Sequence, residues 1–107
     1  MEVKLRVKRP DAVLKQIANA LDGYKKAHPA AEIEAYRQNS VSVRVRVLNP
    51  AFAGMSRTER EEAVWAALDG LEDEAVAEIS LLLLLTHEEA KASFASSDFD
   101  NPIPSKL

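Results

Sequence analysis

The chain has 107 residues, of which 47% are hydrophobic and 29% are charged, and its formal net charge is -3 at pH 7. A chain of this length and composition is expected to form one globular domain around a single core. The absence of cysteine excludes a disulfide framework, a thiol nucleophile and a cluster held by the chain's own thiolates. The negative charge argues against a protein that coats nucleic acid through bulk electrostatics.

The N-terminal part of the chain predicts a strand followed by a helix. Apolar and charged residues alternate over residues 2–8, which is typical of a short strand, and Pro10 ends it. Apolar residues then recur at helical spacing from Val13 to Tyr24, and Pro29 closes this segment. The helix should contribute Leu14, Ile17 and Leu21 to the core.

A β-hairpin is predicted next, with strands over residues 32–37 and 41–47 and a turn at residues 38–40. One face of the second strand carries valine and the other carries serine and arginine. The valines should therefore face a core that is formed with helices on a single face of the sheet. These residues are Val41, Val43, Val45 and Val47.

A second helix and a last strand complete the predicted domain. Residues 56–59 have the S-x-x-E form of a capping box, so a helix should begin there, and Gly70 should end it. Residues 75–86 are predicted to form a strand that is apolar on both faces near its end. Leu82 and Leu84 are expected to face outwards, covered either by the C-terminal tail, through Phe94 or Phe99, or by a second copy of the chain in a homodimer.

These elements predict an α+β fold in which two main helices lie on one face of a small mixed sheet of three to four strands. Residues 1–89 should form this single domain, with an extra N-terminal strand, and residues 90–107 an irregular tail. No apolar run approaches the roughly 20 residues that cross a bilayer. The N-terminus has no secretory signal core, so we expect a cytoplasmic protein without membrane association.

Three short motifs lie around the second helix and the last strand. They are FAGMSRTER at residues 52–60, VWAAL at residues 64–68 and LTHEE at residues 85–89. The first two resemble the BolA signature of F-x-G-x-S, then Arg, then V-[YW] and A-L, and the third resembles the T-P-E-E that closes the family's last strand. The resemblance covers about residues 13–89 and implies a fold like the type II KH module.

The resemblance implies two functions. One is the binding of a monothiol glutaredoxin with a shared iron–sulfur cluster, and the other is nucleic-acid binding in transcriptional regulation, as in a stress response. The family's histidine ligand lies near the start of the last strand, where this chain has Ala77 and Glu78. The loop that often carries a second ligand is short here and has only Gln, Asn and Ser. We therefore expect no metal site and no cofactor.

Basic residues gather on the predicted strands and beside the second helix. On the sheet, Lys4, Arg6, Lys8, Arg44 and Arg46 would share an open face, which is a candidate phosphate-binding surface. The simpler interpretation is a solvated face with cross-strand pairs to Glu32 or Glu34. Arg57 and Arg60 either grip an anion at the helix N-terminus or only solvate the first turn. The candidate partner- or nucleic-acid-binding residues are Lys4, Arg6, Arg44, Arg46, Arg57 and Arg60.

No arrangement typical of catalysis is recognised. His28 and His87 are far apart in the sequence, and the acidic residues of 59–62 and 72–74 occur where solvated acids are common. We therefore predict a non-enzymatic adaptor that binds a protein partner through residues 49–60 and the sheet surface, with a monothiol glutaredoxin as the candidate partner and no cluster ligation. The alternative is a nucleic-acid-binding regulator that uses the basic sheet face.

Overall fold

The computed structural model describes residues 3–6 and 11–100, except for the side chain of Phe94. The described elements confirm the predicted α+β class. In chain order they are β1 (Lys4–Leu5), α1 (Ala12–Ala27), β2 (Glu32–Asn39), β3 (Ser42–Leu48), the 3-10 helix η1 (Pro50–Phe52), α2 (Arg57–Leu68), α3 (Asp73–Glu78), β4 (Ile79–Leu85), α4 (His87–Ala92) and α5 (Phe94–Asp100). No helix among residues 3–6 and 11–100 is long and apolar enough to cross a membrane.

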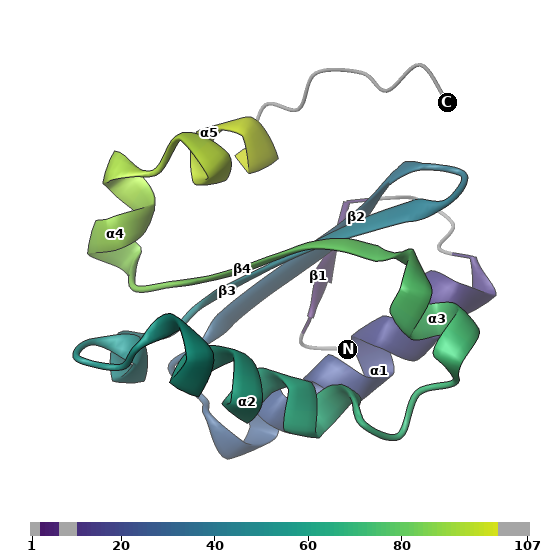
Figure 1. Cartoon of the computed structure of the whole chain (residues 1–107), viewed down its shortest axis with the longest axis horizontal. Coiled ribbons are helices and arrows are strands. Elements are labelled where there is room, and N and C mark those ends of the chain that lie inside the picture. The colour runs from purple at the N-terminus through teal and green to yellow at the C-terminus, as the bar shows by residue number, and fades with distance from the viewer. Residues whose placement is uncertain (1–2, 7–10, 101–107) are drawn as a thin grey trace.

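The four strands form one mixed sheet in the order β1-β2-β3-β4. The central hairpin β2–β3 is antiparallel, whereas β1 pairs in parallel with β2 and β4 in parallel with β3. Helices α1 and α2 lie on one side of the sheet, and α4 and α5 lie on the other (Figure 1). The described chain therefore has three layers, and both faces of the sheet are at least partly covered.

The inner face of the sheet, towards α1 and α2, holds the apolar core. Alternate residues of a strand share a face, and the core valines of β3 are fully buried against the apolar stripes of both helices, as predicted. The fully buried residues that confirm this prediction are Leu14, Ile17, Leu21, Val43, Val45 and Val47, and Val64 and Leu68 of α2 are fully buried with them.

Val41 is the exception to the predicted core. It is 55% exposed, because the hairpin turn occupies Ser40 and Val41 and β3 begins only at Ser42. The Asn39 side chain closes this turn by accepting a hydrogen bond from the Val41 N–H (2.9 Å). Val41 therefore continues the alternation of valines in the sequence but lies outside the strand.

The last strand is shorter than predicted. The sequence predicts a strand over residues 75–86, but β4 begins at Ile79, and Asp73–Glu78 forms α3. Two acidic residues lie in the first turn of α3, where they interact favourably with the helix dipole. Ala75 is buried, so this short helix packs inwards instead of extending the strand. Helix α2 ends at Leu68, slightly before Gly70, the predicted terminator.

A bulge in β4 reverses the predicted faces of this strand. Ile79 pairs with Val43 and Leu81 with Arg44, so Ser80 is an extra residue between two consecutive partners on β3. After an extra residue every side chain moves to the opposite face of the sheet. Leu82 and Leu84 therefore face the core, and the prediction that they face outwards is wrong. The outward residues of β4 are Leu81, Leu83 and Leu85.

Up to Asp100, the last described residue, most of the segment predicted to be an irregular tail is helical. Helix α4 begins with a capping box, in which the Thr86 side chain accepts from the Glu89 N–H and the Glu89 carboxylate accepts from the Thr86 N–H. Helix α5 follows and lies over the outer face of the sheet (Figure 1). At the other end of the chain, Lys4–Leu5 confirm that the N-terminal strand joins the sheet, while Lys8 and Pro10 lie outside the described residues.

Candidate functional site

Three of the six candidate binding residues, Arg6, Arg44 and Arg46, lie together on the outer face of the sheet and form what we term the arginine cluster. Arg44 and Arg46 alternate with the buried valines of β3, so they project from the opposite face. Arg6 follows β1, and its N–H donates to the Ala35 carbonyl of β2 (3.3 Å). None of the three side chains is more than 23% exposed, because α5 covers them. The prediction of an open basic face is therefore wrong.

The ring of Phe99 lies at the centre of this covered surface and is fully buried. The guanidinium groups of Arg6 and Arg46 lie 4.6 Å and 4.7 Å from its centroid. Tyr36 meets the same ring edge-on, with 4.8 Å between the centroids. Cation–π contacts of this kind contribute about 0.5–2 kcal/mol each. Two cations and one tyrosine therefore hold the aromatic ring of α5 against the sheet.

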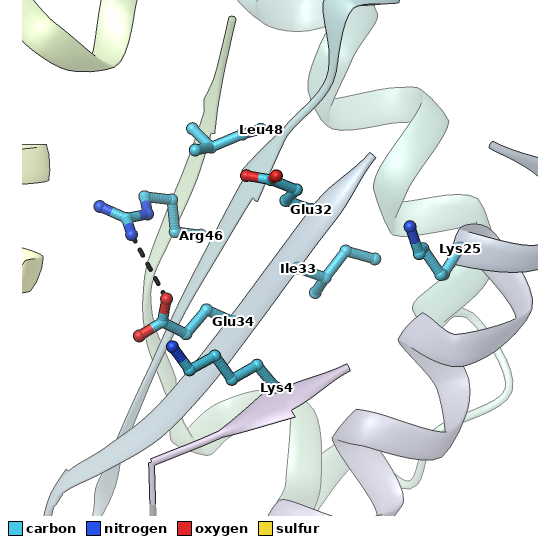
Figure 2. Close-up of a pocket in the computed structure, with 7 residues that line it drawn as sticks. All are labelled: Lys4, Lys25, Glu32, Ile33, Glu34, Arg46 and Leu48. Atoms are coloured by element: carbon cyan, nitrogen blue, oxygen red, sulfur yellow. Dashed lines mark hydrogen bonds and ion pairs between the residues drawn. The ribbon is translucent and has the colours of Figure 1, made fainter. Parts of the chain in front are cut away.

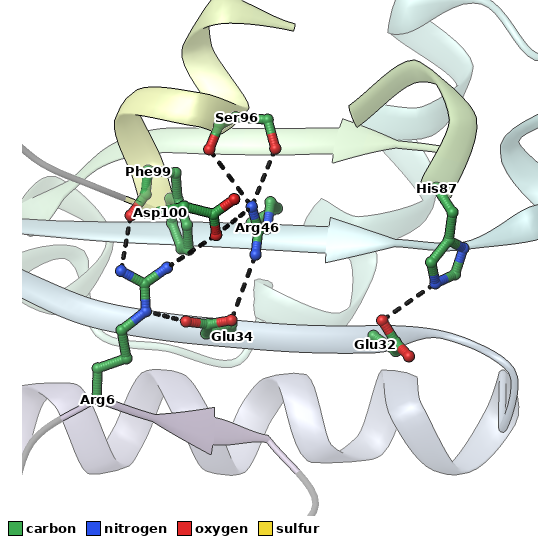
Figure 3. Close-up of polar contacts among 8 residues, drawn as sticks. All are labelled: Arg6, Glu32, Glu34, Arg46, His87, Ser96, Phe99 and Asp100. Atoms are coloured by element: carbon green, nitrogen blue, oxygen red, sulfur yellow. Dashed lines mark hydrogen bonds and ion pairs between the residues drawn. The ribbon is translucent and has the colours of Figure 1, made fainter. Parts of the chain in front are cut away.

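Acidic groups of α5 neutralise the arginine cluster on either side of this ring. Asp98 accepts from Arg44 (2.7 Å), and Asp100 pairs with Arg46 (2.8 Å) and Arg6 (3.6 Å). The backbone of α5 also takes part, because the Phe99 carbonyl accepts from Arg6 (2.7 Å). Figure 3 shows the contacts of Asp100 and of the Phe99 carbonyl, together with the bond from Arg46 to the Ser96 hydroxyl (3.0 Å). Each arginine of the cluster therefore has at least one partner on α5.

The sheet contributes one carboxylate of its own. Glu34 lies opposite Arg46 on β2, and it accepts from Arg46 (3.4 Å) and from Arg6. The cross-strand pair to Glu34 is thus present, as the simpler interpretation of the basic face required. Burial lowers the pKa of Arg6 from its ordinary value, and the nearby Arg46 acts in the same direction. Burial also acts to lower the pKa of Arg44, but hydrogen bonds to Tyr36 and Asp98 outweigh it, so this pKa is raised.

Lys4 lies beside the arginine cluster on the edge strand β1 and is exposed. It borders a cavity of about 350 Å³. The lining residues are Lys4, Lys25, Glu32, Ile33, Glu34, Arg46 and Leu48 (Figure 2). Two acidic side chains oppose three basic ones here, and the Lys25 ammonium donates to the carbonyls of Pro29 and Ala31. The cavity is therefore of mixed charge, and Lys4 extends the arginine cluster towards the edge of the sheet.

The other two candidate residues, Arg57 and Arg60, lie in a different place, beside an apolar groove. This cavity, about 530 Å³, is formed by the end of the η1 loop, the first turns of α2, the length of β4 and the start of α5. We term it the leucine groove. Its lining residues are Met55, Arg57, Arg60, Glu61, Leu81, Leu82, Leu83, Leu84, Leu85 and Ala95.

Arg60 forms hydrogen bonds with three segments of the chain at one end of this groove. Its guanidinium donates to the Met55 carbonyl (3.2 Å), to the Leu84 carbonyl (2.9 Å) and to both carboxylate oxygens of Glu89 (2.6 Å and 3.0 Å). This bidentate pair raises the pKa of Arg60 and lowers the pKa of Glu89 to about 2. Arg60 therefore links the loop, β4 and α4. The anion that Arg60 binds beside the helix N-terminus is the Glu89 carboxylate of the same chain.

Arg57 differs from Arg60, because its side chain is 91% exposed and its one described ion pair is with Glu61 on the same helix (3.2 Å). At the start of α2 the Ser56–Glu59 capping box forms as predicted, with Ser56 accepting from the Glu59 N–H (3.1 Å) and Glu59 from the Ser56 N–H (2.9 Å). Arg57 is thus an exposed charge beside the groove, and its ion pair with Glu61 is also exposed and contributes little.

The outer edge of β4 runs along the leucine groove. The Leu85 carbonyl accepts from the Asn49 N–H (3.0 Å), so the backbone of Leu85 faces β3. Backbone groups of a strand alternate in direction, and those of Leu82 and Leu84 therefore face the outer edge. The Arg60 guanidinium donates to the Leu84 carbonyl, so at this end of the edge the carbonyl is already hydrogen-bonded and cannot pair freely with another strand.

Neither histidine belongs to a cluster of ligands. His28 caps the end of α1 and stacks on Tyr24 with 4.3 Å between the ring centroids, and His87 lies 3.1 Å from Glu32. Glu78, one of the two residues that the BolA resemblance would align with the family's histidine, accepts from Arg37 (3.0 Å). Within the part of the chain that the structure describes, no three His, Cys, Asp or Glu side chains are grouped to hold a metal.

Comparisons of the chain with protein-family models, with curated proteins and with solved structures give no match. The resemblance to the BolA family accordingly stays a prediction from the motifs of residues 52–60, 64–68 and 85–89.

Several residues of the outer face were not singled out by sequence reasoning. The sequence suggests Phe99 only as a cover for leucines, and the roles of the others depend on where α5 docks. The sequence contains one indication of this docking: a phenylalanine between two aspartates near the end of a chain whose strands are rich in arginine. The residues concerned are Tyr36, Ser96, Asp98, Phe99 and Asp100.

Proposed function

We propose that this chain is a non-enzymatic adaptor that binds an extended segment of a protein partner in the leucine groove. The observation that carries the proposal is an apolar cavity of about 530 Å³ along an edge strand whose outward residues are all leucine. A contiguous apolar surface on a protein of this size typically marks an interaction site. Protein binding is also the function expected from the sequence, and the leucine groove is the site that we propose for it.

The shape of the groove favours an extended segment as its occupant. The lining includes each residue from Leu81 to Leu85, so the groove follows the strand for about 13 Å at about 3.3 Å per residue. An extended chain that runs along an edge strand can add hydrogen bonds to its free backbone groups, while alternate side chains enter apolar pockets. The backbone of Leu82 faces this edge, and Met55 offers an adaptable apolar contact.

The identity of the partner follows from the BolA resemblance. The motif FAGMSRTER, which carries much of that resemblance, contributes Met55, Arg57 and Arg60 to the groove. A monothiol glutaredoxin is therefore the partner that we propose. The chain would bind it without a cluster ligand, because Ala77 and Glu78 stand where the family's histidine is expected.

The test is a calorimetric titration of the wild-type chain and two variants with a monothiol glutaredoxin. Leu83→Asp places a charge in the groove and should weaken binding at least about tenfold, since desolvating a carboxylate against apolar surface is unfavourable. Val41→Asp is the matched control, because Val41 is an exposed apolar residue at the hairpin turn. It should bind like the wild type.

Two results would count against the proposal. One is that the wild type does not bind the glutaredoxin, or that Leu83→Asp binds it equally well. The other is that light scattering shows a dimer for the wild type and a monomer for Leu83→Asp. A second copy of the chain would then be the occupant of the groove. Open-face nucleic-acid binding is not proposed, because α5 covers Arg6, Arg44 and Arg46.

A further inference from the structure

We propose that the arginine cluster is a binding site for single-stranded nucleic acid, and that α5 occupies it as an intramolecular competitor. This site lies on the outer face of β3 and differs from the leucine groove, so it does not depend on the proposed function. In α5, Asp98, Phe99 and Asp100 present an anion, an aromatic ring and a second anion to the sheet.

The contacts of these three residues match those of a nucleic-acid strand. Proteins that bind single strands stack bases on aromatic rings and on guanidinium planes and neutralise the flanking phosphates with basic side chains. The Phe99 ring takes the place of a base, between Arg6 and Arg46 and edge-on to Tyr36. The carboxylates stand in for phosphates, at 2.7 Å from Arg44 and 2.8 Å from Arg46 (Figure 3 shows Asp100).

The charges of the surface explain why displacement of α5 would expose a basic site. With α5 in place, the three arginines face three carboxylates, those of Glu34, Asp98 and Asp100. When α5 leaves, Glu34 is the one of these three described carboxylates that remains against the three cations. Tyr36, now 6% exposed, would lose the ring that covers it and become the stacking platform. Lys4, exposed on the neighbouring strand, would extend the basic surface to the edge of the sheet.

Helix α5 has the properties of a displaceable element. It has only 7 residues, and helices far shorter than about 12 residues depend on their packing for stability. Its two carboxylate side chains are 39% and 52% exposed, so solvent and salt screen their ion pairs. The preceding helix is held separately by the Arg60–Glu89 pair, so α5 can leave the sheet about the junction at Ser93 while α4 stays in place.

The test uses the full chain and a fluorescently labelled mixed-sequence single-stranded DNA of about 12 nucleotides, within the size range of single-strand sites. Asp98→Asn with Asp100→Asn removes both carboxylate charges and keeps the side-chain shape. Fluorescence anisotropy should show binding at least about tenfold tighter than that of the wild type, because a competing anion is lost from a phosphate site. Asp100→Asn alone, which keeps the Asp98–Arg44 pair, should give a smaller gain, about threefold.

A matched control separates the site from the overall charge. Asp69→Asn with Asp73→Asn changes the net charge by the same amount at two exposed positions, the C-cap of α2 and the first residue of α3. This control should bind as weakly as the wild type. Adding Arg44→Gln and Arg46→Gln to the Asp98→Asn, Asp100→Asn variant should abolish its gain, and circular dichroism verifies that each variant is folded.

Three outcomes would overturn the proposal. The first is no gain in affinity when the two aspartates of α5 are neutralised in a folded chain. The second is an equal gain in the Asp69→Asn, Asp73→Asn control, which would assign the effect to net charge. The third is an equal gain for duplex DNA of the same sequence, since paired bases cannot stack on Tyr36. A gain for the single strand that disappears without Arg44 and Arg46 supports the proposal.

Discussion

The two faces of the sheet are closed by different physical means, although β3 contributes to both. On the inner face, Val43, Val45 and Val47 are fully buried among aliphatic side chains of α1 and α2. On the outer face, Arg44 and Arg46 alternate with these valines and are covered by the aromatic and acidic residues of α5. One strand therefore separates an apolar interface from one made of charges.

This difference implies different stabilities for the two interfaces. Apolar burial contributes about 25 cal/mol per Å² and depends little on salt. Ion pairs with carboxylates that are 39% and 52% exposed are screened by salt and contribute little each. The inner face should therefore hold the fold together, whereas the outer face should open locally, below the free energy of global unfolding.

The inner face should give the largest effect of a single substitution. Ile17→Ala removes a fully buried side chain of α1 that faces the sheet. The lost burial and the cavity should lower the free energy of unfolding by about 2–5 kcal/mol. Urea denaturation followed by circular dichroism measures this change. A loss below about 1 kcal/mol would mean that the core is less tightly packed than the burial of Ile17 indicates.

Phe99→Ala tests the outer face in the same way. A buried phenylalanine in a cooperative core usually costs about 3–5 kcal/mol when truncated to alanine. Here we expect about 1–3 kcal/mol, because the loss cannot exceed the free energy with which α5 docks on the sheet. Limited proteolysis should show new cleavage within α5 while the rest of the chain stays resistant. A loss as large as that of Ile17→Ala, with global unfolding, would show that both faces form one cooperative unit.

The capping box of α2 should contribute less than either face. Ser56→Ala removes the acceptor of the Glu59 N–H and should cost about 0.5–2 kcal/mol in thermal melts. Thr86→Ala removes the equivalent acceptor in α4 and is the matched comparison. Because α4 lies outside the inner core, its variant should lower the melting temperature less. An unchanged melt for Ser56→Ala, together with weaker partner binding, would instead assign Ser56 to the partner contact.

The smallest effect is expected from the pair that joins the groove to α4. The pKa of Glu89 is about 2 in the folded chain because of its hydrogen bonds with Arg60 and the Thr86 N–H, and it is about 4.3 in an unfolded chain. A lowered pKa stabilises the fold at pH values above the unfolded pKa, and this stabilisation disappears as the pH falls towards 2.

Glu89→Gln keeps a hydrogen-bond acceptor for the cap but removes the charge. Its melting temperature should therefore lie below that of the wild type at pH 6, and the two should converge as the pH falls to about 2. Glu88→Gln, at an exposed neighbouring position on α4, is the control and should show a smaller difference at pH 6. A pH-independent difference for Glu89→Gln would place its effect outside the Arg60 pair.

The sequence predicts the inner layer well because local patterns determine it. The helical spacing of Leu14, Ile17 and Leu21 and the alternation of Val43 and Val45 each place side chains on one face without reference to distant residues. The motif Ser56–Glu59 likewise specifies its own helix start.

The outer layer is predicted poorly because it depends on pairings that are distant in sequence. One extra residue at Ser80 reverses the faces of β4, and nothing in an alternating pattern reveals it. The sequence of α5 has no amphipathic spacing that predicts a helix, and its docking needs Phe99 to meet Arg6 and Arg46. The partner of Arg60 is Glu89 on another helix. The sequence therefore predicts that Arg6, Arg44 and Arg46 share one face of the sheet, but it does not predict that α5 covers them.

The most direct test of a releasable outer face is native-state hydrogen exchange of the wild-type chain at low salt and at about 1 M NaCl, where the Debye length falls to about 3 Å. The α5 amides, such as the Ser97 N–H that donates to the Ser93 carbonyl (3.1 Å), report on the outer face, and the β3 amides report on the core. We expect salt to accelerate exchange in α5 and to leave exchange in β3 unchanged. Equal acceleration in both elements, or none in α5, would contradict the conclusion that screened ion pairs hold a separable helix over the arginine cluster.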